Sequence, residues 1–225
     1  MLDTLYWPGG LAPKAVTLRP AGVAVIGPVS LSGRTQVLRS DAGYWEVVAS
    51  GIPVGGAADV GAWRAFLTSM EGGARGAYVP AWDYEQAPWV SAGGRSANIL
   101  ADKSFTASFY FTGGYGFYNP PIRVYLNGAH SLGATTIAVT VTTAGTIRAG
   151  MVFGLLSERV HVIREKLSAT SWSIWPPLRR DYPTAIRCEF AFPTLKAILA
   201  APSGGELGLA YGRYGSVDAT FRELV

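Results

Sequence analysis

Glycine and proline occur so often along this chain that long helices have little room to form. The 225 residues include 28 glycines and 14 prolines, whereas these two residue types together make up about 12% of an average protein. Both residues weaken or break the interior of a helix. Between them lie short stretches rich in valine, isoleucine, threonine and aromatic residues, which favour strands. The sequence therefore predicts a mainly β fold with many turns.

The second half of the chain shows this pattern most regularly. A dense glycine and proline stretch at 113–121 suggests a hinge, and short strand-like segments follow it at intervals of about 8 to 12 residues. These segments are 122–131, 135–143, 146–155, 159–167, 170–176 and 185–192. Such spacing is typical of a small barrel or sandwich. We therefore expect a first domain over 1–121, a small β domain over 122–202, and terminal strands over 203–225 that return to the first domain.

One helix is predicted in the first domain, over about 57–71. Its apolar residues recur every three or four positions. They are Val60, Trp63, Phe66 and Met70. The pair Gly72-Gly73 supplies a left-handed stop. We expect the helix to pack the side of Val60, Trp63, Phe66 and Met70 against a sheet.

The segments before this helix have the composition of strands. Residues 5–31 mix aromatic and β-branched residues with prolines at short intervals, which favours an extended arm and an edge strand. Residues 35–49 contain two strand-like stretches separated by the turn sequence Asp41-Ala42-Gly43. This second segment is a candidate hairpin.

The chain is poor in charge, which indicates a surface that partners cover. Charged residues make up 15% of the sequence, against about 25% in a typical domain. The formal charge is +4, yet the basic residues are scattered and do not form the stripe that binds phosphates. Tryptophan and arginine are common in protein interfaces. The residues we expect at an oligomer or partner interface are Trp7, Arg34, Arg39, Arg75, Trp82, Trp89 and Arg123.

Features that the sequence lacks bear on the expected compartment and on the expected cofactors. No run of about 18 apolar residues is present, so membrane insertion is not expected. The N-terminal sequence lacks the basic and apolar regions of a signal peptide, which favours folding in a cytoplasm. One cysteine and two histidines make a metal site hard to assemble, and we expect no metal or cofactor.

Groups that could carry catalysis have no recognisable motif around them. Asp83 and Glu85 lie in an aromatic loop that would suit sugar chemistry, but their spacing is uninformative. His161 alternates with valines and is expected to be a hydrogen-bonded strand residue, and Cys188 a small buried apolar residue. We predict no catalytic residues and no enzymatic activity.

Two longer stretches resemble the distal tail proteins of siphophages. The first joins 32–47, with a Gly-Arg pair and a strand ending near tryptophan, to the tryptophan-bearing helix and strand of 61–80. The second, 130–185, resembles the small β-barrel insertion of tail-tip proteins, with 147–151 at the turn and 175–179 at the exit. The ending 217–225 resembles the terminal strand of that family.

The resemblance implies a β-sandwich belt domain with one α-helix, plus a second small β-barrel or galectin-like domain. It also implies a structural protein that assembles with itself into a ring, commonly a hexamer. In that family the ring joins the tail tube protein to the tail hub protein and supports tail fibre or receptor-binding proteins. DNA passes through the ring without specific binding. The expected location is the virion tail tip, after assembly in the host bacterial cytoplasm.

Two alternatives stay open at this stage. A carbohydrate-binding module of the tail tip would use the aromatic loop from Trp82 to Trp89 together with a galectin-like second domain. A tail-associated cell-wall hydrolase would use Asp83 and Glu85 as its pair of carboxylates.

Overall fold

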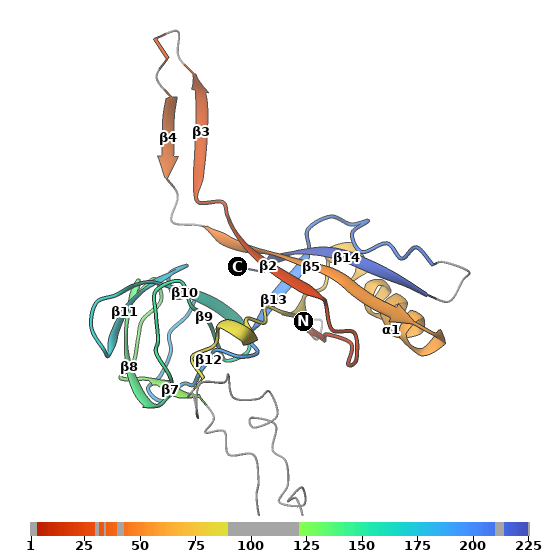
Figure 1. The fold of residues 1–225 in the computed structure, drawn as a ribbon. Helices are drawn as coiled ribbons and strands as arrows, with labels where there is room; N and C mark the ends of the chain where they lie inside the picture. Colours follow the sequence, from red (N-terminus) through yellow and green to blue (C-terminus); the bar gives the residue numbers. More distant parts are fainter. Residues whose placement is uncertain are drawn as a thin grey trace, which may run out of the picture. The chain divides into compact units, whose positions relative to one another are not determined.

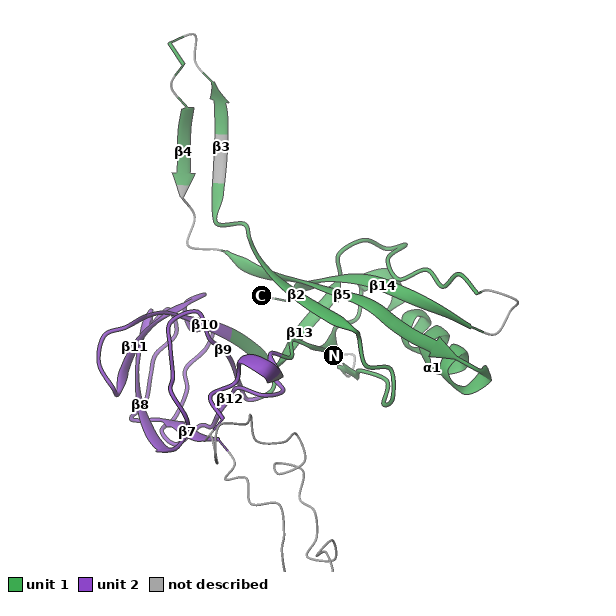
Figure 2. Cartoon of the chain, in the orientation of Figure 1, with its two compact units in different colours: residues 1–82, 157–160, 194–225 green, residues 83–156, 161–193 purple. Residues whose placement is uncertain are grey.

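The computed structural model describes residues 4–29, 32–33, 35–39, 43–89, 122–209 and 214–224. The chain forms two compact units (Figure 2). Unit 1 contains residues 1–82, 157–160 and 194–225, and unit 2 contains residues 83–156 and 161–193. The expected hinge at 113–121 lies outside the described residues.

Unit 1 is built on a mixed six-stranded sheet (Figure 1). Its strands are β1 (Leu5–Tyr6), β6 (Ala77–Pro80), β13 (Thr194–Leu199), β14 (Tyr214–Glu223), β5 (Tyr44–Gly55) and β2 (Ala15–Ala21), in that spatial order. β1 pairs with β6 in parallel and the other pairs are antiparallel. The N-terminal segment thus supplies both edge strands of the sheet, in line with the edge strand expected there.

Helix α1 (Ala57–Ser69) packs on one face of this sheet. Its start agrees with the expected start, and it ends two residues earlier than expected. The 3-10 turn η1 (Glu71–Gly73) follows, with Gly72 and Gly73 at positive φ, as the glycine pair predicts. On β5, residues alternate between the buried face under the helix and a half-buried outer face.

The candidate hairpin over 35–49 is wrong in its pairing, although both of its strands form. β4 (Thr35–Arg39) pairs with β3 (Ala24–Val29), and β5 pairs with β2. The four strands therefore pair in a nested order, with β2 against β5 and β3 against β4. Strands β3 and β4 form a sheet of their own, and among the described strands they pair only with each other. We call this pair, Ala24–Val29 with Thr35–Arg39, the β3–β4 arm (Figure 1).

Unit 2 is a nearly closed antiparallel barrel of six strands. The strands are β12 (Cys188–Glu189), β9 (Val152–Leu155), β10 (Arg159–Lys166), β11 (Ser171–Trp175), β8 (Thr136–Thr143) and β7 (Arg123–Leu126), in that spatial order. Leu126 N donates to Ile186 O at 2.8 Å, and Ala185 N donates to Leu126 O at 2.9 Å, which links β7 to the segment just before β12. Of the two forms expected for the second domain, the structure has the barrel.

The apolar interior of the barrel comes from all six strands and from the segment before them. Its largest members are aromatic: Phe153 lies 6.1 Å from Trp172 and 5.6 Å from Phe190 between ring centroids. Ala87 and Trp89 also belong to this core. The prediction of a mainly β chain with one helix and a small barrel is confirmed.

Candidate functional site

The four residues expected to pack the helix on the sheet all lie in the interior of unit 1. Val60, Trp63, Phe66 and Met70 are 9%, 0%, 5% and 0% exposed. The indole Nε1 of Trp63 donates to the backbone oxygen of Gly205 at 3.0 Å. Gly205 has φ +81°, and a Cβ there would lie 3.1 Å from Trp63 Cζ2. The helix is therefore held by burial of its apolar side chains and by the close contact between the Trp63 indole and the backbone of Gly205.

Trp7, one of the expected interface residues, packs within its own unit. Its ring lies 5.4 Å from Phe66, 5.7 Å from Trp63 and 5.8 Å from Phe221, each in an edge-on arrangement. Its Nε1 donates to Leu11 O at 2.6 Å. The half-buried Trp7 thus covers the aromatic core under α1.

The aromatic loop from Trp82 to Trp89 does not present its tryptophans as an open platform. Trp89 is 7% exposed and belongs to the barrel core, and Trp82 is half-buried. Gly145 N donates to Pro88 O at 2.7 Å, and a Cβ at Gly145 would overlap the carbonyl of Trp89. The loop is tightly packed on the barrel at this point.

The four expected interface arginines lie on different elements. Arg75 is half-buried after η1, and its backbone N donates to Met70 O at 3.2 Å. Arg123 is exposed at the start of β7. Arg39 ends β4, where its backbone pairs with Ala24, and its side chain lies outside the described atoms. Arg34 lies outside the described residues.

The two carboxylates considered for sugar chemistry differ in their surroundings. Asp83 is half-buried, and burial raises the pKa of its carboxyl above the ordinary value of 3.8. Glu85 is exposed within η2 (Tyr84–Gln86), a single 3-10 turn. A raised pKa suits a general acid, but no further described feature gathers a sugar-sized site around this pair.

His161 and Cys188 are both fully buried in unit 2. His161 Nδ1 donates to the carbonyl oxygen of Pro176 at 2.8 Å, which agrees with the hydrogen-bonded strand histidine expected from the sequence. Burial raises the pKa of the Cys188 thiol well above 9.0, so the thiol stays protonated and unreactive. Cys188 is the small buried residue that its alternation predicts.

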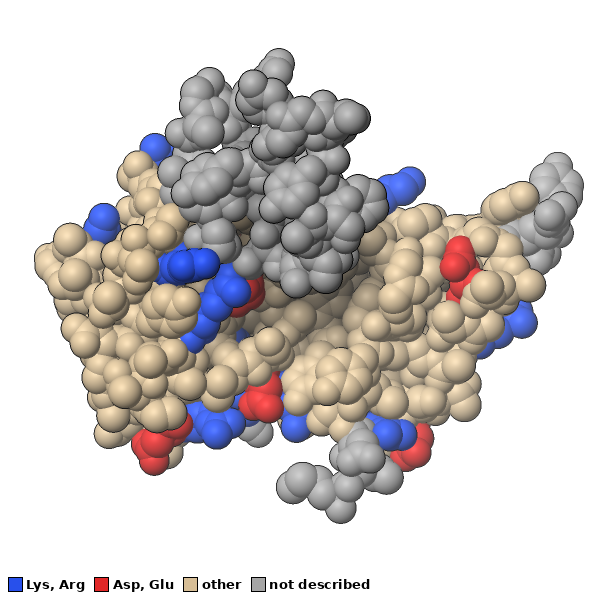
Figure 3. Space-filling model, turned by 90° about the horizontal axis from the view of Figure 1, so that it is seen from below, with Lys and Arg blue, Asp and Glu red and all other residues tan. Residues whose placement is uncertain are grey.

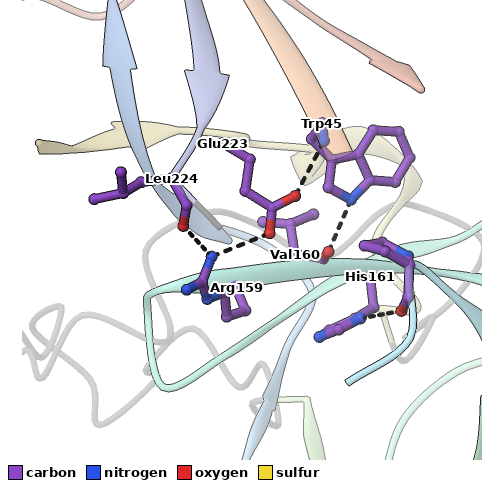
Figure 4. A network of polar contacts seen from close by, with 7 residues as sticks. Trp45, Arg159, Val160, His161, Glu223 and Leu224 are labelled. Atoms are coloured by element: carbon purple, nitrogen blue, oxygen red, sulfur yellow. Dashed lines mark hydrogen bonds and ion pairs between the residues drawn. The ribbon is translucent and has the colours of Figure 1, made fainter. Parts of the chain in front are cut away.

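A network of polar contacts around Glu223 was not predicted from the sequence (Figure 4). Glu223 is 3% exposed, and its Oε1 lies 3.3 Å from Arg159 Nη1. Its Oε2 accepts a hydrogen bond from Trp45 N at 3.0 Å, and Trp45 Nε1 donates to Val160 O at 2.8 Å. Arg159 also donates to the backbone oxygen of Leu224. These contacts fix the end of β14 to β5 and to the start of β10.

The sequence analysis also missed the exposed apolar residues of the β3–β4 arm. Val29, Val37 and Leu38 are 67%, 59% and 71% exposed. Val37 and Leu38 are consecutive in a strand, so their side chains lie on opposite faces of the arm. Both faces of the arm thus present apolar groups to solvent. The turn residues Ser32 and Gly33 were the available sequence indication of this hairpin.

Charges are dispersed over the surface drawn in Figure 3, where Lys and Arg occur singly or in small groups among Asp and Glu. Within the described part of the chain, no group of three or more His, Cys, Asp or Glu side chains is placed to hold a metal ion. The described residues also contain no helix with the length and apolar character needed to span a membrane.

The site residues therefore fall into two groups. Most tryptophans stabilise the interiors of the two units, and the arm carries three of the exposed large apolar side chains, Val29, Val37 and Leu38. No protein-family model matches the sequence, and no curated protein matches it either.

Proposed function

We propose that this protein is a structural subunit of a long, non-contractile phage tail, forming the ring that joins the tail tube to the tip. The proposal rests on the resemblance of residues 32–80 and 130–185 to siphophage distal tail proteins. The resemblance implies a β-sandwich unit with one helix and a second small β domain; the structure has a mixed six-stranded sheet with one helix and a separate small barrel, so the helix and the barrel support the proposal.

The observation that carries the proposal is the exposed apolar arm. Exposed apolar side chains clustered on one element mark sites of protein interaction. A ribbon of two strands is also marginally stable in water and needs a covering layer. These properties fit a subunit that works by contact with other protein chains.

The candidate reactive groups favour this reading over an enzyme. His161 and Cys188 are buried, and Asp83 and Glu85 differ in exposure with no described binding site around them. Trp89, at one end of the aromatic loop considered for carbohydrate binding, is buried in the barrel core, so its ring is not open to a sugar. The ring function is mechanical: subunits match the symmetry of the tube and provide a platform for adsorption proteins.

Imaging tests the proposal. Purified protein at high concentration should form a closed annulus with an open centre in negative-stain micrographs, and we expect six copies per ring. Gold-labelled antibodies against this chain should mark the distal end of tails in particles that carry it. Label that is absent from the tails, together with catalytic turnover by the purified protein, would refute the proposal.

A further inference from the structure

The barrel of unit 2 is closed by a short stretch of chain, residues 185–189, which contains β12. Ala185 N donates to Leu126 O at 2.9 Å, and Leu126 N donates to Ile186 O at 2.8 Å. These bonds join the stretch to β7, while β12 pairs with β9 on its other side. We call residues 185–189 the closing segment, because its contacts on both sides turn the six-stranded sheet into a nearly closed barrel.

The pairing of the closing segment with β9 is short. It consists of Cys188 opposite Leu155 and Glu189 opposite Gly154. By comparison, β7 pairs with β8 at four positions, and β10 pairs with β11 at four positions. Because the hydrogen bonds of an antiparallel ladder increase with its length, the seam between β12 and β9 has fewer bonds to break than either of those pairs.

The closing segment also contributes little to the apolar core. Cys188 is its one fully buried residue, while Ile186, Arg187 and Glu189 are half-buried and Ala185 is exposed. The adjoining strands β7 and β9 each bury two larger apolar side chains. Segments with few buried apolar contacts open locally at a lower free energy than the core strands around them.

Backbone strain adds to the weakness of this segment. Ala185 has φ +65°, in the left-handed region that residues with a Cβ rarely adopt. Such a conformation persists only while the surrounding structure holds it, and here the bond from Ala185 N to Leu126 O does so. Detachment allows Ala185 to return to an ordinary φ, so the strain favours the detached state.

Side-chain contacts of Arg187 help to hold the segment in place. Its Nη2 donates to Ile122 O at 3.3 Å and lies 3.5 Å from Glu189 Oε2. Detachment breaks the contact with Ile122, which lies just before β7. The ion pair with Glu189 lies within the closing segment and moves with it.

We propose that the closing segment detaches from β7 and β9 as a unit while the other five strands of the barrel stay folded. The segment then acts as a strap that opens and recloses under native conditions, and its opening uncovers Cys188 and the apolar interior behind it. The inference concerns unit 2 alone and does not depend on the proposed ring function.

The single cysteine of the chain makes this opening measurable. Cys188 is fully buried and burial raises the pKa of its thiol, so DTNB reacts with it only after an opening. Labelling of the wild-type protein in water should be at least about tenfold faster than the globally unfolded fraction allows, and it should rise less steeply with urea than that fraction does. Labelling that follows the globally unfolded fraction at every urea concentration would overturn the inference.

A second probe separates detachment of the segment from unfolding of the whole of unit 2. Combining Cys188→Ala with Val139→Cys moves the only thiol to β8, at a residue that is also fully buried in the same core. Each labelling rate is divided by the rate of the same protein in concentrated urea, which removes differences in intrinsic reactivity. The thiol on β8 should then react at least about tenfold more slowly than Cys188. Equal rates would show that unit 2 opens as a whole, and the proposal would fail.

Relief of the backbone strain supplies a third test. Ala185→Gly removes the penalty of a positive φ from the closed state, so labelling of Cys188 should slow about fivefold. Glu71→Gly makes the same kind of change at a residue with φ +50° in unit 1, and it should leave the labelling rate unchanged. A wild-type rate in Ala185→Gly, or equal slowing by both variants, would contradict detachment of this segment.

Discussion

At the scale of single residues, Glu223 places a negative charge in the interior of unit 1. Its carboxylate pairs with Arg159 and accepts from Trp45 N. Glu223→Gln removes the charge and leaves the Arg159 guanidinium, 16% exposed, without its counter-ion. Because breaking a buried pair leaves an uncompensated charge, we expect the free energy of unfolding to fall by about 2 to 3 kcal/mol. Urea denaturation measures this loss.

Glu46 provides the control for that experiment. It faces Arg19 at 3.8 Å, with both side chains substantially exposed. Exposed pairs contribute little to stability, so Glu46→Gln should cost less than about 1 kcal/mol. Equal losses for the two variants would mean that burial of Glu223 has no energetic consequence.

The buried thiol of Cys188 predicts a dependence of stability on pH. Its pKa is raised in the folded protein by burial, above the ordinary value of 9.0. Below pH 9.0 both states keep the proton; above it the unfolded thiol ionises first, so stability falls as pH rises. The loss from this group should approach about 1.4 kcal/mol per pH unit. Cys188→Ala should show a shallower slope between pH 9.5 and 10.5, and identical slopes would contradict the prediction.

Single residues were also where sequence reasoning was weakest. Composition cannot separate a tryptophan in a core from one in an interface, because both uses favour large aromatic side chains. Trp89 lies in the barrel core against Gly145, which is distant from it in the sequence. The Glu223 network joins residues up to 178 positions apart, and no local pattern indicates it.

At the scale of elements, α1 depends on a buried face and tolerates change on its exposed face. Trp63→Ala empties a fully buried site and loses the hydrogen bond to Gly205 O. We expect it to lower the free energy of unfolding by about 3 to 5 kcal/mol. Gly61 is exposed on the same helix, and a Cβ there meets nothing within 4 Å. Gly61→Ala should therefore raise stability by about 0.5 to 1 kcal/mol.

Thermal and urea denaturation of both variants check this contrast. A loss of stability in Gly61→Ala would show that the exposed face of α1 is constrained by something other than helix propensity. A loss below about 1 kcal/mol in Trp63→Ala would show that the indole is not the main anchor of the helix.

The helix could be predicted from the sequence and the arm could not, because a helix depends on local residue spacing whereas strand pairing depends on distant residues. Val60, Trp63, Phe66 and Met70 repeat within 11 positions of one another, and Gly72 ends the pattern, so all the information is local. The pairing of β4 had to be decided between two turns, one at Ser32-Gly33 and one at Asp41–Gly43. Local turn preference does not decide which strands pair. β5 pairs with β2 and β14, which are distant in sequence, so β5 is not available to pair with β4.

At the scale of the whole molecule, composition predicted the fold class, but it did not predict the order in which the chain passes between the two units. Alternating strands and frequent turns predicted a β protein with a barrel. The chain, however, enters unit 2 at Asp83, contributes 157–160 to unit 1 and returns there at Thr194. Short segments such as 157–160 leave no compositional trace, since four residues are fewer than an ordinary strand contains.

The proposed assembly predicts how self-association responds to salt. If the contacts between copies are made by the apolar arm, their strength comes from burial, which salt does not screen and sulfate strengthens. Sedimentation of the wild-type protein should then change less than about threefold in association constant between 0.1 and 0.5 M NaCl, and association should tighten in sodium sulfate. Contacts made by scattered arginines would instead weaken as the screening length shortens. A fall of tenfold or more in the association constant over this range would show that charged side chains, and not the apolar arm, make the contacts between copies.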